Sequence, residues 1–244
     1  MTAPFVLVGA WILLVALFAK IPSFEELENH KSRIEIADTY DKGEGEYSLL
    51  RADFVEAFSN GEKKIDRVVT DDGEQYTISN PFSMKWVTTP DSTYRCILYY
   101  NYYKVEDGSA PQTAEAVSAG QVACPQVVPL AQLDKEMKTD PVKFESAWMS
   151  RSGKYLNLSL YLMTGKSDDE EASHHLAVVQ DTIMQNTDNT RTCYLRLFHD
   201  QGAVPEYYST QIYASILTKE LDADSVRLSI NTYKGEFVKA FPVR

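Results

Sequence analysis

The chain has 244 residues, and 44% of them are hydrophobic, which is enough for one large or two ordinary globular domains and excludes wholesale disorder. Its formal net charge of −11 argues against a nucleic-acid partner, because such binding depends on Lys and Arg side chains that neutralise phosphates. Tyrosine is abundant, with 15 copies, and it favours half-exposed β-structure.

Residues 1–19 contain no acidic or basic side chain and are almost entirely apolar. The length of this segment lies between the core of a signal peptide and a minimal membrane span of about 17–25 residues. We predict a signal peptide or membrane anchor here, followed by a charged tether at residues 20–46; a buried core helix is the alternative for the apolar run. The rest of the chain is therefore expected in the cell envelope, in the periplasm or at the outer membrane, with membrane contact through this segment.

Residues 47–129 alternate between apolar and polar positions in short runs, which is typical of β-strands. The step Asp72-Gly73 separates two such runs and predicts a hairpin over residues 64–79, because glycine accepts the positive φ of a tight turn. Asn80-Pro81 then predicts a turn. Further strands are expected at residues 84–87, 92–103 and 120–128. About five short strands of this kind predict a small OB-like β-barrel.

The strand at residues 92–103 is rich in tyrosine and is the best candidate for a ligand surface in this domain. Alternation places Tyr100 and Tyr102 on one face, and Tyr99 and Tyr103 on the other. Stacked tyrosines beside Trp86 could bind sugar rings or a peptide. The alternative is ordinary β packing with cross-strand aromatic pairs. The candidate binding residues are Trp86, Tyr99, Tyr100, Tyr102 and Tyr103.

Residues 130–141 form the predicted linker, with at most a short amphipathic helix that ends at Asp140-Pro141. Residues 142–244 then carry about seven alternating runs, which predict an immunoglobulin-like β-sandwich. The clearest strand runs from Tyr155 to Met163. Its four leucines are expected to face the core, and the opposite face of Tyr, Asn, Ser and Tyr is expected to point outward.

Acidic and histidine side chains in the second domain offer little chemistry. The acidic run 168–171 could attract calcium, but its spacing matches no EF-hand loop, and a solvated loop is expected. His174 and His175 are neighbours on a predicted strand and therefore point to opposite faces.

A hydrolase could be imagined from His199 and Asp200 with Ser209 as the nucleophile, but the chain lacks a G-x-S-x-G elbow. We expect no catalytic residue, no bound metal and no cofactor.

The three cysteines, Cys96, Cys124 and Cys193, are widely spaced and lie among apolar residues. No C-x-x-C pair points to zinc or redox chemistry. Buried, inert thiols are expected, and a Cys96–Cys124 disulfide remains the alternative in an oxidising compartment.

Several short segments, taken in order and spacing, carry a resemblance to a known family. They are Leu50-Arg51-Ala52-Asp53-Phe54, Thr70-Asp71-Asp72-Gly73, Pro90-Asp91-Ser92-Thr93-Tyr94-Arg95, Asp140-Pro141-Val142-Lys143, Tyr155-Leu156-Asn157-Leu158, and the stretch from His199-Asp200-Gln201-Gly202 to Ser229-Ile230-Asn231-Thr232-Tyr233. Over residues 45–244 the chain resembles the NigD-like family. The resemblance implies an N-terminal OB-type barrel and a C-terminal β-sandwich behind a lipoprotein signal.

The family takes its name from a gene at a bacteriocin locus, so the resemblance implies an immunity or accessory role and brings no active-site residues. Leu17-Phe18-Ala19 looks like the start of a lipoprotein signal, but Lys20 stands where the lipid-bearing cysteine would be expected. We therefore predict a non-enzymatic envelope protein with a protein or glycan partner. The alternative is a carbohydrate- or peptide-binding module that uses the candidate Tyr and Trp residues.

Overall fold

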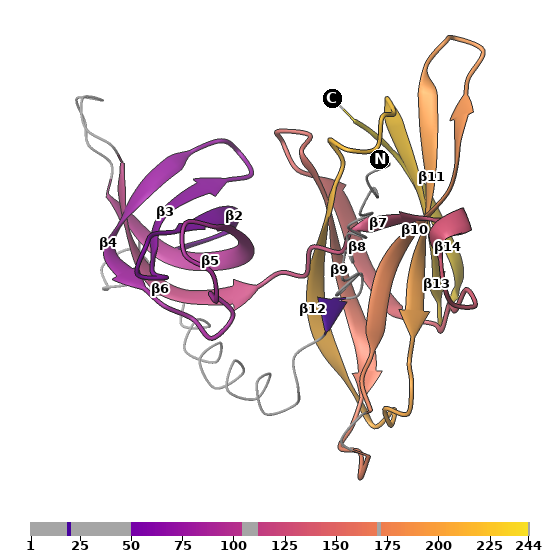
Figure 1. Ribbon diagram of the computed structural model, residues 1–244, viewed down its shortest axis with the longest axis horizontal. Helices are drawn as coiled ribbons and strands as arrows, with labels where there is room; N and C mark the ends of the chain where they lie inside the picture. The colour runs from indigo at the N-terminus through magenta and orange to yellow at the C-terminus, as the bar shows by residue number, and fades with distance from the viewer. Residues whose placement is uncertain (1–18, 21–49, 104–111, 170–171, 244) are drawn as a thin grey trace, which may run out of the picture.

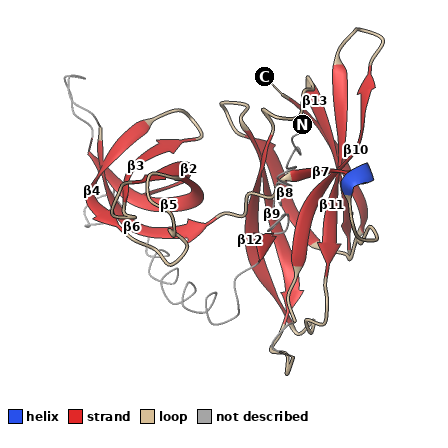
Figure 2. Ribbon diagram, viewed as in Figure 1, coloured by secondary structure: helices blue, strands red, loops and turns tan. Residues whose placement is uncertain are grey.

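The computed structural model describes residues 19–20, 50–103, 112–169 and 172–243. It is an all-β protein with a closed barrel and a β-sandwich, which confirms the predicted fold class (Figure 1). Strands make up nearly all of its regular structure (Figure 2). Most of the predicted leader and tether lies outside the described residues. Within the described part, no helix is long and apolar enough to cross a membrane.

The barrel is built from five strands that close in the order β2-β3-β4-β6-β5. Their bounds are β2 Leu50–Ser59, β3 Ile65–Thr70, β4 Gln75–Phe82, β5 Thr93–Tyr103 and β6 Thr113–Gln121. The predicted hairpin is confirmed as β3 and β4, and Gly73 in its turn has a φ of 88°. Apolar side chains such as Val55, Val68 and Leu98 fill the barrel interior.

Three predictions in the first domain are wrong. Residues 84–87 do not form a strand; they lie in loop and turn conformation, and Asn80-Pro81 belongs to β4 instead of a turn. Pro81 lies next to the end of β4, beside a register irregularity between Ile65 and Arg67 of β3, where its missing N–H is tolerated. The last barrel strand, β6, begins at Thr113 and ends at Gln121, earlier than the expected strand at residues 120–128.

The sandwich consists of two sheets. A three-stranded sheet has the order β12-β9-β8, and the second sheet has the order β1-β10-β11-β13-β14, with β7 paired to β10. The bounds are β1 Ala19–Lys20, β7 Val127–Pro129, β8 Lys143–Met149, β9 Tyr155–Thr164, β10 His175–Gln185, β11 Arg191–Asp200, β12 Tyr208–Leu217, β13 Ser225–Thr232 and β14 Gly235–Pro242. The sequence had predicted that residues 127–129 belong to the barrel, and this was wrong: β7 pairs in parallel with β10 and is part of the sandwich.

The sandwich core lies between the two sheets, and the leucine strand faces it as predicted. Leu156, Leu158 and Leu160 of β9 are completely buried, and Leu162 is nearly so. They meet residues of the other sheet such as Leu195 and Leu228. Each buried leucine stabilises the fold by about 1.5–3 kcal/mol.

The linker forms one short 3-10 helix, η2, at Leu130–Gln132, in place of the predicted amphipathic helix. Its helical turn stops at Leu133, whose backbone is extended (φ −70°, ψ 113°). Leu133 and Met137 nevertheless use their apolar side chains, packing on Val179 and Phe198 at the outer face of the larger sheet. The linker therefore covers part of that face.

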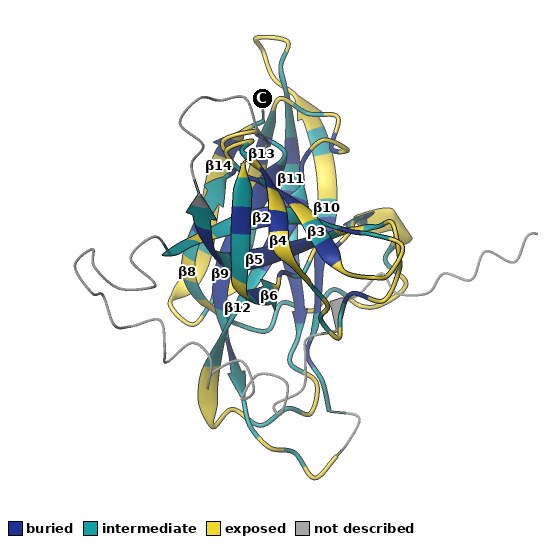
Figure 3. Cartoon of the chain, turned by 90° about the vertical axis from the view of Figure 1, so that its left-hand side faces the viewer, coloured by how far each residue is buried: buried dark blue, intermediate teal, exposed yellow. Residues whose placement is uncertain are grey.

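The barrel lies against the outer face of the three-stranded sheet, and Figure 3 shows it in front of the sandwich. Contacts cross from β2 and β5 of the barrel to β8, β9 and β12. The face of β9 that the sequence assigned to solvent is therefore buried over much of its length: Tyr155 is 7% exposed, Asn157 is fully buried and Ser159 is 2% exposed. The prediction was wrong because alternation distinguishes two faces but does not show what lies beyond them.

Candidate functional site

A ring of hydrogen bonds around Arg95 joins the two domains. The Arg95 side chain on β5 is only 3% exposed, and it pairs with Asp71 of the barrel at 2.7 Å. It also donates to the Asn157 side-chain oxygen of β9 (3.1 Å) and to the Ser215 hydroxyl of β12 (3.1 Å). A buried charge is tolerated only when it is paired and hydrogen-bonded, so these bonds fix the barrel against the sandwich.

Two further hydrogen bonds of the sandwich side chains close this ring. The Asn157 amide nitrogen donates to Asp71 at 2.9 Å, and the Ser215 hydroxyl donates to the Asn157 oxygen at 2.7 Å. The Arg95 guanidinium carbon lies 4.1 Å from the centre of the Tyr155 ring, an additional cation–π contact. We call Arg95, Asp71, Asn157 and Ser215 the domain seam.

Glu56 of β2 extends the seam at one side. Its carboxylate accepts hydrogen bonds from Lys154 and from the Tyr155 hydroxyl (2.6 Å). Burial by itself raises the pKa of Glu56, but these bonds outweigh it and hold that pKa below its ordinary value. Burial and the bond to Glu56 raise the pKa of Tyr155. At neutral pH this group is therefore a carboxylate bonded to a neutral tyrosine and a lysine.

Aromatic rings form the third part of the contact between the domains. The Phe54 ring of the barrel meets Trp148 edge to face, with centroids 5.3 Å apart, and meets Tyr213 in the same way at 5.5 Å. Such pairs add about 0.5–1.5 kcal/mol each beyond the area they bury. The contact therefore combines apolar packing with the polar seam.

The predicted aromatic surface is divided by the structure. Tyr100 is fully buried inside the barrel, where its hydroxyl donates to Asp53 at 2.8 Å, so it cannot belong to an exposed aromatic face. Tyr102 is partly buried and packs on the barrel core, with the Arg51 guanidinium 5.2 Å from its ring centre. Strand curvature turns this face into the barrel interior, and the side chains close the barrel instead of offering a platform.

The other predicted site residues lie elsewhere. Trp86 is partly buried and packs on Tyr94, with ring centroids 5.7 Å apart. Tyr99 is on the opposite face of β5, near Tyr213 of the sandwich, and together with burial it raises the pKa of Tyr213. The side chain of Tyr103 lies outside the described residues. The four residues whose side chains the structure describes therefore do not form one continuous surface.

The histidine considered for hydrolysis is engaged in a buried pair. His199 lies 1% exposed, and its Nδ1 is 2.9 Å from the backbone oxygen of Asp140, which can only accept, so Nδ1 carries the proton. His174 Nδ1 then donates to His199 Nε2 over 3.1 Å. Burial lowers the pKa of both rings, that of His174 to about 4. No bond from His199 to Ser209 occurs in the described structure, and Asp200 instead pairs with Lys138 at 2.9 Å.

No group of three or more potential metal ligands is found among the residues that the structure describes. The three thiols are free, so the alternative disulfide is not formed. Cys96 and Cys193 are buried as predicted, whereas Cys124 is exposed. Burial raises the pKa of Cys96 to about 12, so this thiol is inert at neutral pH.

A closed five-stranded barrel fixed to a β-sandwich defines a two-domain all-β architecture. Residues 126–241 match the family model of the NigD-like C-terminal beta sandwich domain. Residues 126–241 are therefore a NigD-like C-terminal domain, in agreement with the family resemblance of the sequence. No curated protein matches it in sequence.

Several solved structures are similar in fold over most of this chain. A NigD-like immunity protein from Bacteroides caccae has a TM-score of 0.58 and 21% identity, over 78% of this chain and 91% of that one. A protein of unknown function from Bacteroides vulgatus has a TM-score of 0.60 and 13% identity, over 80% and 91%. A protein from Bacteroides fragilis described as a lipoprotein has a TM-score of 0.54 and 9% identity, over 80% and 98%. With identities this low, the TM-scores show a common fold alone.

The sequence predicted no role for the residues of the domain seam, although Asp71, Arg95 and Asn157 lie in the segments that carry the family resemblance. Arg95 interrupts an otherwise apolar and aromatic strand, which is a usable signal, because a charge at a central strand position needs a partner. Its partners Asp71, Asn157 and Ser215 lie in turns or strands far along the chain and carry no local mark. Only the fold brings them together.

Proposed function

We propose that this protein is a non-enzymatic binding protein of the cell envelope that meets a protein partner with its two domains held in one fixed arrangement. Immunity to a secreted toxin is one form of this function, suggested by the NigD-like immunity protein of the same fold. The observation that carries the proposal is the domain seam, in which the buried Arg95 bonds to both domains.

A fixed seam favours binding because a rigid surface loses little freedom when a partner docks. Most domains within one chain are joined by contacts that allow relative motion. Here Arg95 and its bonds would have to leave their partners before the barrel could move, exposing a buried ion pair. The outer surfaces of barrel and sandwich are therefore presented to a partner in constant relative positions.

An envelope location is supported by the apolar segment at residues 1–19 and by the similar fold of the Bacteroides fragilis protein described as a lipoprotein. Fractionation of a native host that leaves the full-length chain in the cytoplasm would refute this part of the proposal.

Partner binding is tested by chemical crosslinking of envelope fractions with the wild type, Arg95→Met and Arg151→Met. Arg151 is a matched control, because it lies near the seam but forms only an exposed, 3.7 Å pair with Asp72. We expect one partner to crosslink to the wild type and to Arg151→Met, and much less to Arg95→Met. Equal crosslinking to all three would show that a fixed arrangement is not required.

The alternative of a glycan- or peptide-binding module based on the predicted aromatic residues has less support, because Tyr100 is buried and Tyr99 lies on the other face. A glycan array tests it directly. Binding of a glycan that is lost in Tyr102→Ala, with the fold intact, would favour this alternative.

A further inference from the structure

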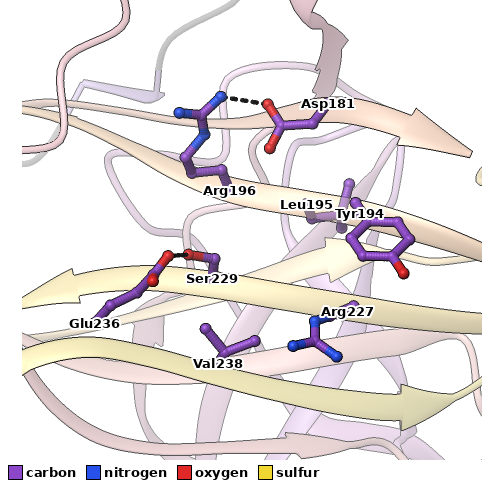
Figure 4. A pocket seen from close by; sticks show the side chains of 8 residues that line it. All are labelled: Asp181, Tyr194, Leu195, Arg196, Arg227, Ser229, Glu236 and Val238. Carbon is purple, nitrogen blue, oxygen red and sulfur yellow. Dashed lines mark hydrogen bonds and ion pairs between the residues drawn. The ribbon is translucent and has the colours of Figure 1, made fainter.

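The outer face of the larger sandwich sheet contains a hollow of about 410 Å³ that spans strands β10, β11, β13 and β14 (Figure 4). The linker side chains Leu133 and Met137 cover this face only around Phe198 and Val179. The hollow lies on the remaining part. We call it the sheet-face hollow, and it is lined by Tyr194, Arg196, Arg227, Ser229, Glu236 and Val238, with Asp181 and Leu195.

Most charges in the hollow are already engaged within the sheet. A register irregularity between Gln180 and Thr182 of β10 leaves Asp181 without a partner residue in the β-ladder, and its carboxylate pairs with Arg196. On the other side, the Ser229 hydroxyl donates to the Glu236 carboxylate. Figure 4 shows these two bonded pairs as dashed lines, and no such line reaches Arg227.

Arg227 is the exception. It is exposed and makes no hydrogen bond or ion pair with any residue that the structure describes. The sheet register explains this, because its cross-strand neighbours are Tyr194 on β11 and Ala240 on β14, neither of which carries a negative charge. Glu236 stands opposite Asn231, four residues from Arg227, which is roughly 13 Å along a strand.

Apolar surface lies next to this free guanidinium. Val238 is 40% exposed and lines the hollow beside Ser229. Tyr194 adds an aromatic ring in the same row as Arg227. A cation without a partner beside apolar and aromatic surface fits a ligand that offers a carboxylate next to an apolar group.

We propose that the sheet-face hollow binds an acidic segment of a partner protein, with an Asp or Glu side chain on Arg227 and a neighbouring apolar side chain against Val238. This inference rests on the proposed binding function and names the chemistry of its partner. Arginine presents a planar fork that matches a carboxylate in two parallel hydrogen bonds. In a chain with a net charge of −11, a free arginine offers local attraction to an acidic segment that the rest of the surface repels.

The probe is a random peptide library displayed on phage and panned against the full chain. Each enriched peptide is then synthesised in two forms, one with Glu and one with Gln at each acidic position. The Kd of both forms is measured for the wild-type protein and for the variants Arg227→Gln and Lys239→Gln. Lys239 is the matched control, because its removal changes the net charge equally but it lies over Phe241 on the other face of β14.

We expect enriched peptides to share an acidic residue beside an apolar one. Their Glu→Gln forms and the Arg227→Gln variant should each weaken binding about tenfold or more, which is the effect of losing a charged hydrogen-bond partner. Lys239→Gln should leave the affinity near that of the wild type. Enrichment without acidic residues, no enrichment, or equal affinity for Arg227→Gln would overturn the inference.

The failure of this site and the failure of the proposed function have different signatures. A partner that crosslinks equally to the wild type and to Arg227→Gln in the envelope would reject the hollow and leave the binding function standing. A wild type that crosslinks to no envelope partner would reject the binding function, whatever the peptides do.

Discussion

The two sheets of the sandwich both turn a polar outer face away from the shared core, but the polar groups of the two faces bond to different partners. The face of the three-stranded sheet carries Asn157 and Ser215, and its hydrogen bonds cross to the barrel through Arg95. The face of the larger sheet pairs Asp181 with Arg196 and Ser229 with Glu236 within the sheet, and Arg227 has no partner among the described residues. A polar sheet face is thus a permanent interface when its bonds cross to another element, and an available surface when they close among its own strands.

The largest expected effect comes from removing the charge that crosses the seam. Arg95→Met breaks a buried ion pair and leaves Asp71 and Asn157 without their shared donor, so the free energy of unfolding should fall by about 3–5 kcal/mol. Urea denaturation measures this change, and small-angle scattering reports whether the domains separate. Arg151→Met, which loses only an exposed pair, should change stability by less than about 1 kcal/mol. If both variants lost a similar free energy of unfolding, the domain seam would not be what fixes the barrel to the three-stranded sheet.

As the pH falls, protonation should destabilise the buried pair of His174 and His199 before it affects Glu56 beside the domain seam. The pKa of His174 is lowered from 6.5 to about 4 by burial, so the unfolded chain binds more protons than the folded one between these values. Stability should therefore fall as the pH drops from 6.5 to 4, by up to about 3 kcal/mol for His174. The Glu56 carboxylate, whose pKa is lowered, adds its loss only below its ordinary value of 4.5.

Denaturation at a series of pH values tests the order of these losses. His174→Gln should flatten the profile between pH 6.5 and 4, whereas Glu56→Gln should alter it below that range. An unchanged slope in His174→Gln would show that the histidine pair does not govern this window.

A smaller loss of stability is expected when the aromatic part of the contact between the domains is removed. Phe54→Ala removes one ring and two edge-to-face contacts, so stability should fall by about 1–3 kcal/mol. A double-mutant cycle with Tyr213→Ala separates the contact from the general loss of area. The coupling energy should favour the pair by about 0.5–1.5 kcal/mol, and a value near zero would leave the polar bonds as the main support of the interface.

The smallest stability effect belongs to the open face. Arg227→Gln should change the free energy of unfolding by no more than about 0.5 kcal/mol, because the side chain is exposed and has no partner among the described residues. Thermal and urea denaturation check this directly. A large destabilisation would mean that Arg227 supports the sheet, and it would remove the contrast with Arg95.

Much of the fold could be predicted because its signals are local. Asp72-Gly73 specifies a tight turn by its own backbone preference, and the alternating leucines of β9 mark a core face without reference to the rest of the chain. The three-residue strand β7 could not be found in this way, because it exists only through its pairing with β10.

The site could be predicted far less well. Tyr100 looks like a surface tyrosine in the sequence, and only barrel closure shows that its ring points inward to Asp53. Asn157 and Ser159 look solvent-facing for the same reason that Arg227 does, namely that they are polar residues on the non-core side of a strand. Which of these sides another domain covers depends on contacts between residues far apart in sequence, such as Arg95 with Ser215.

The short stretch between barrel and sandwich also decides where this protein can be divided. Ala123 exchanges backbone hydrogen bonds with Tyr213 and Ser215 of the three-stranded sheet, and Val127–Pro129 pairs with β10 of the other sheet. The segment therefore hydrogen-bonds to both sheets before β8, the first long strand of the sandwich, begins. An expressed C-terminal fragment that starts at Val142 would lack these hydrogen bonds and leave the backbone groups of β10 that face β7 unpaired. A fragment that starts just before Ala123 keeps the bonds to both sheets. A fragment intended for crystallisation or partner screening should begin there.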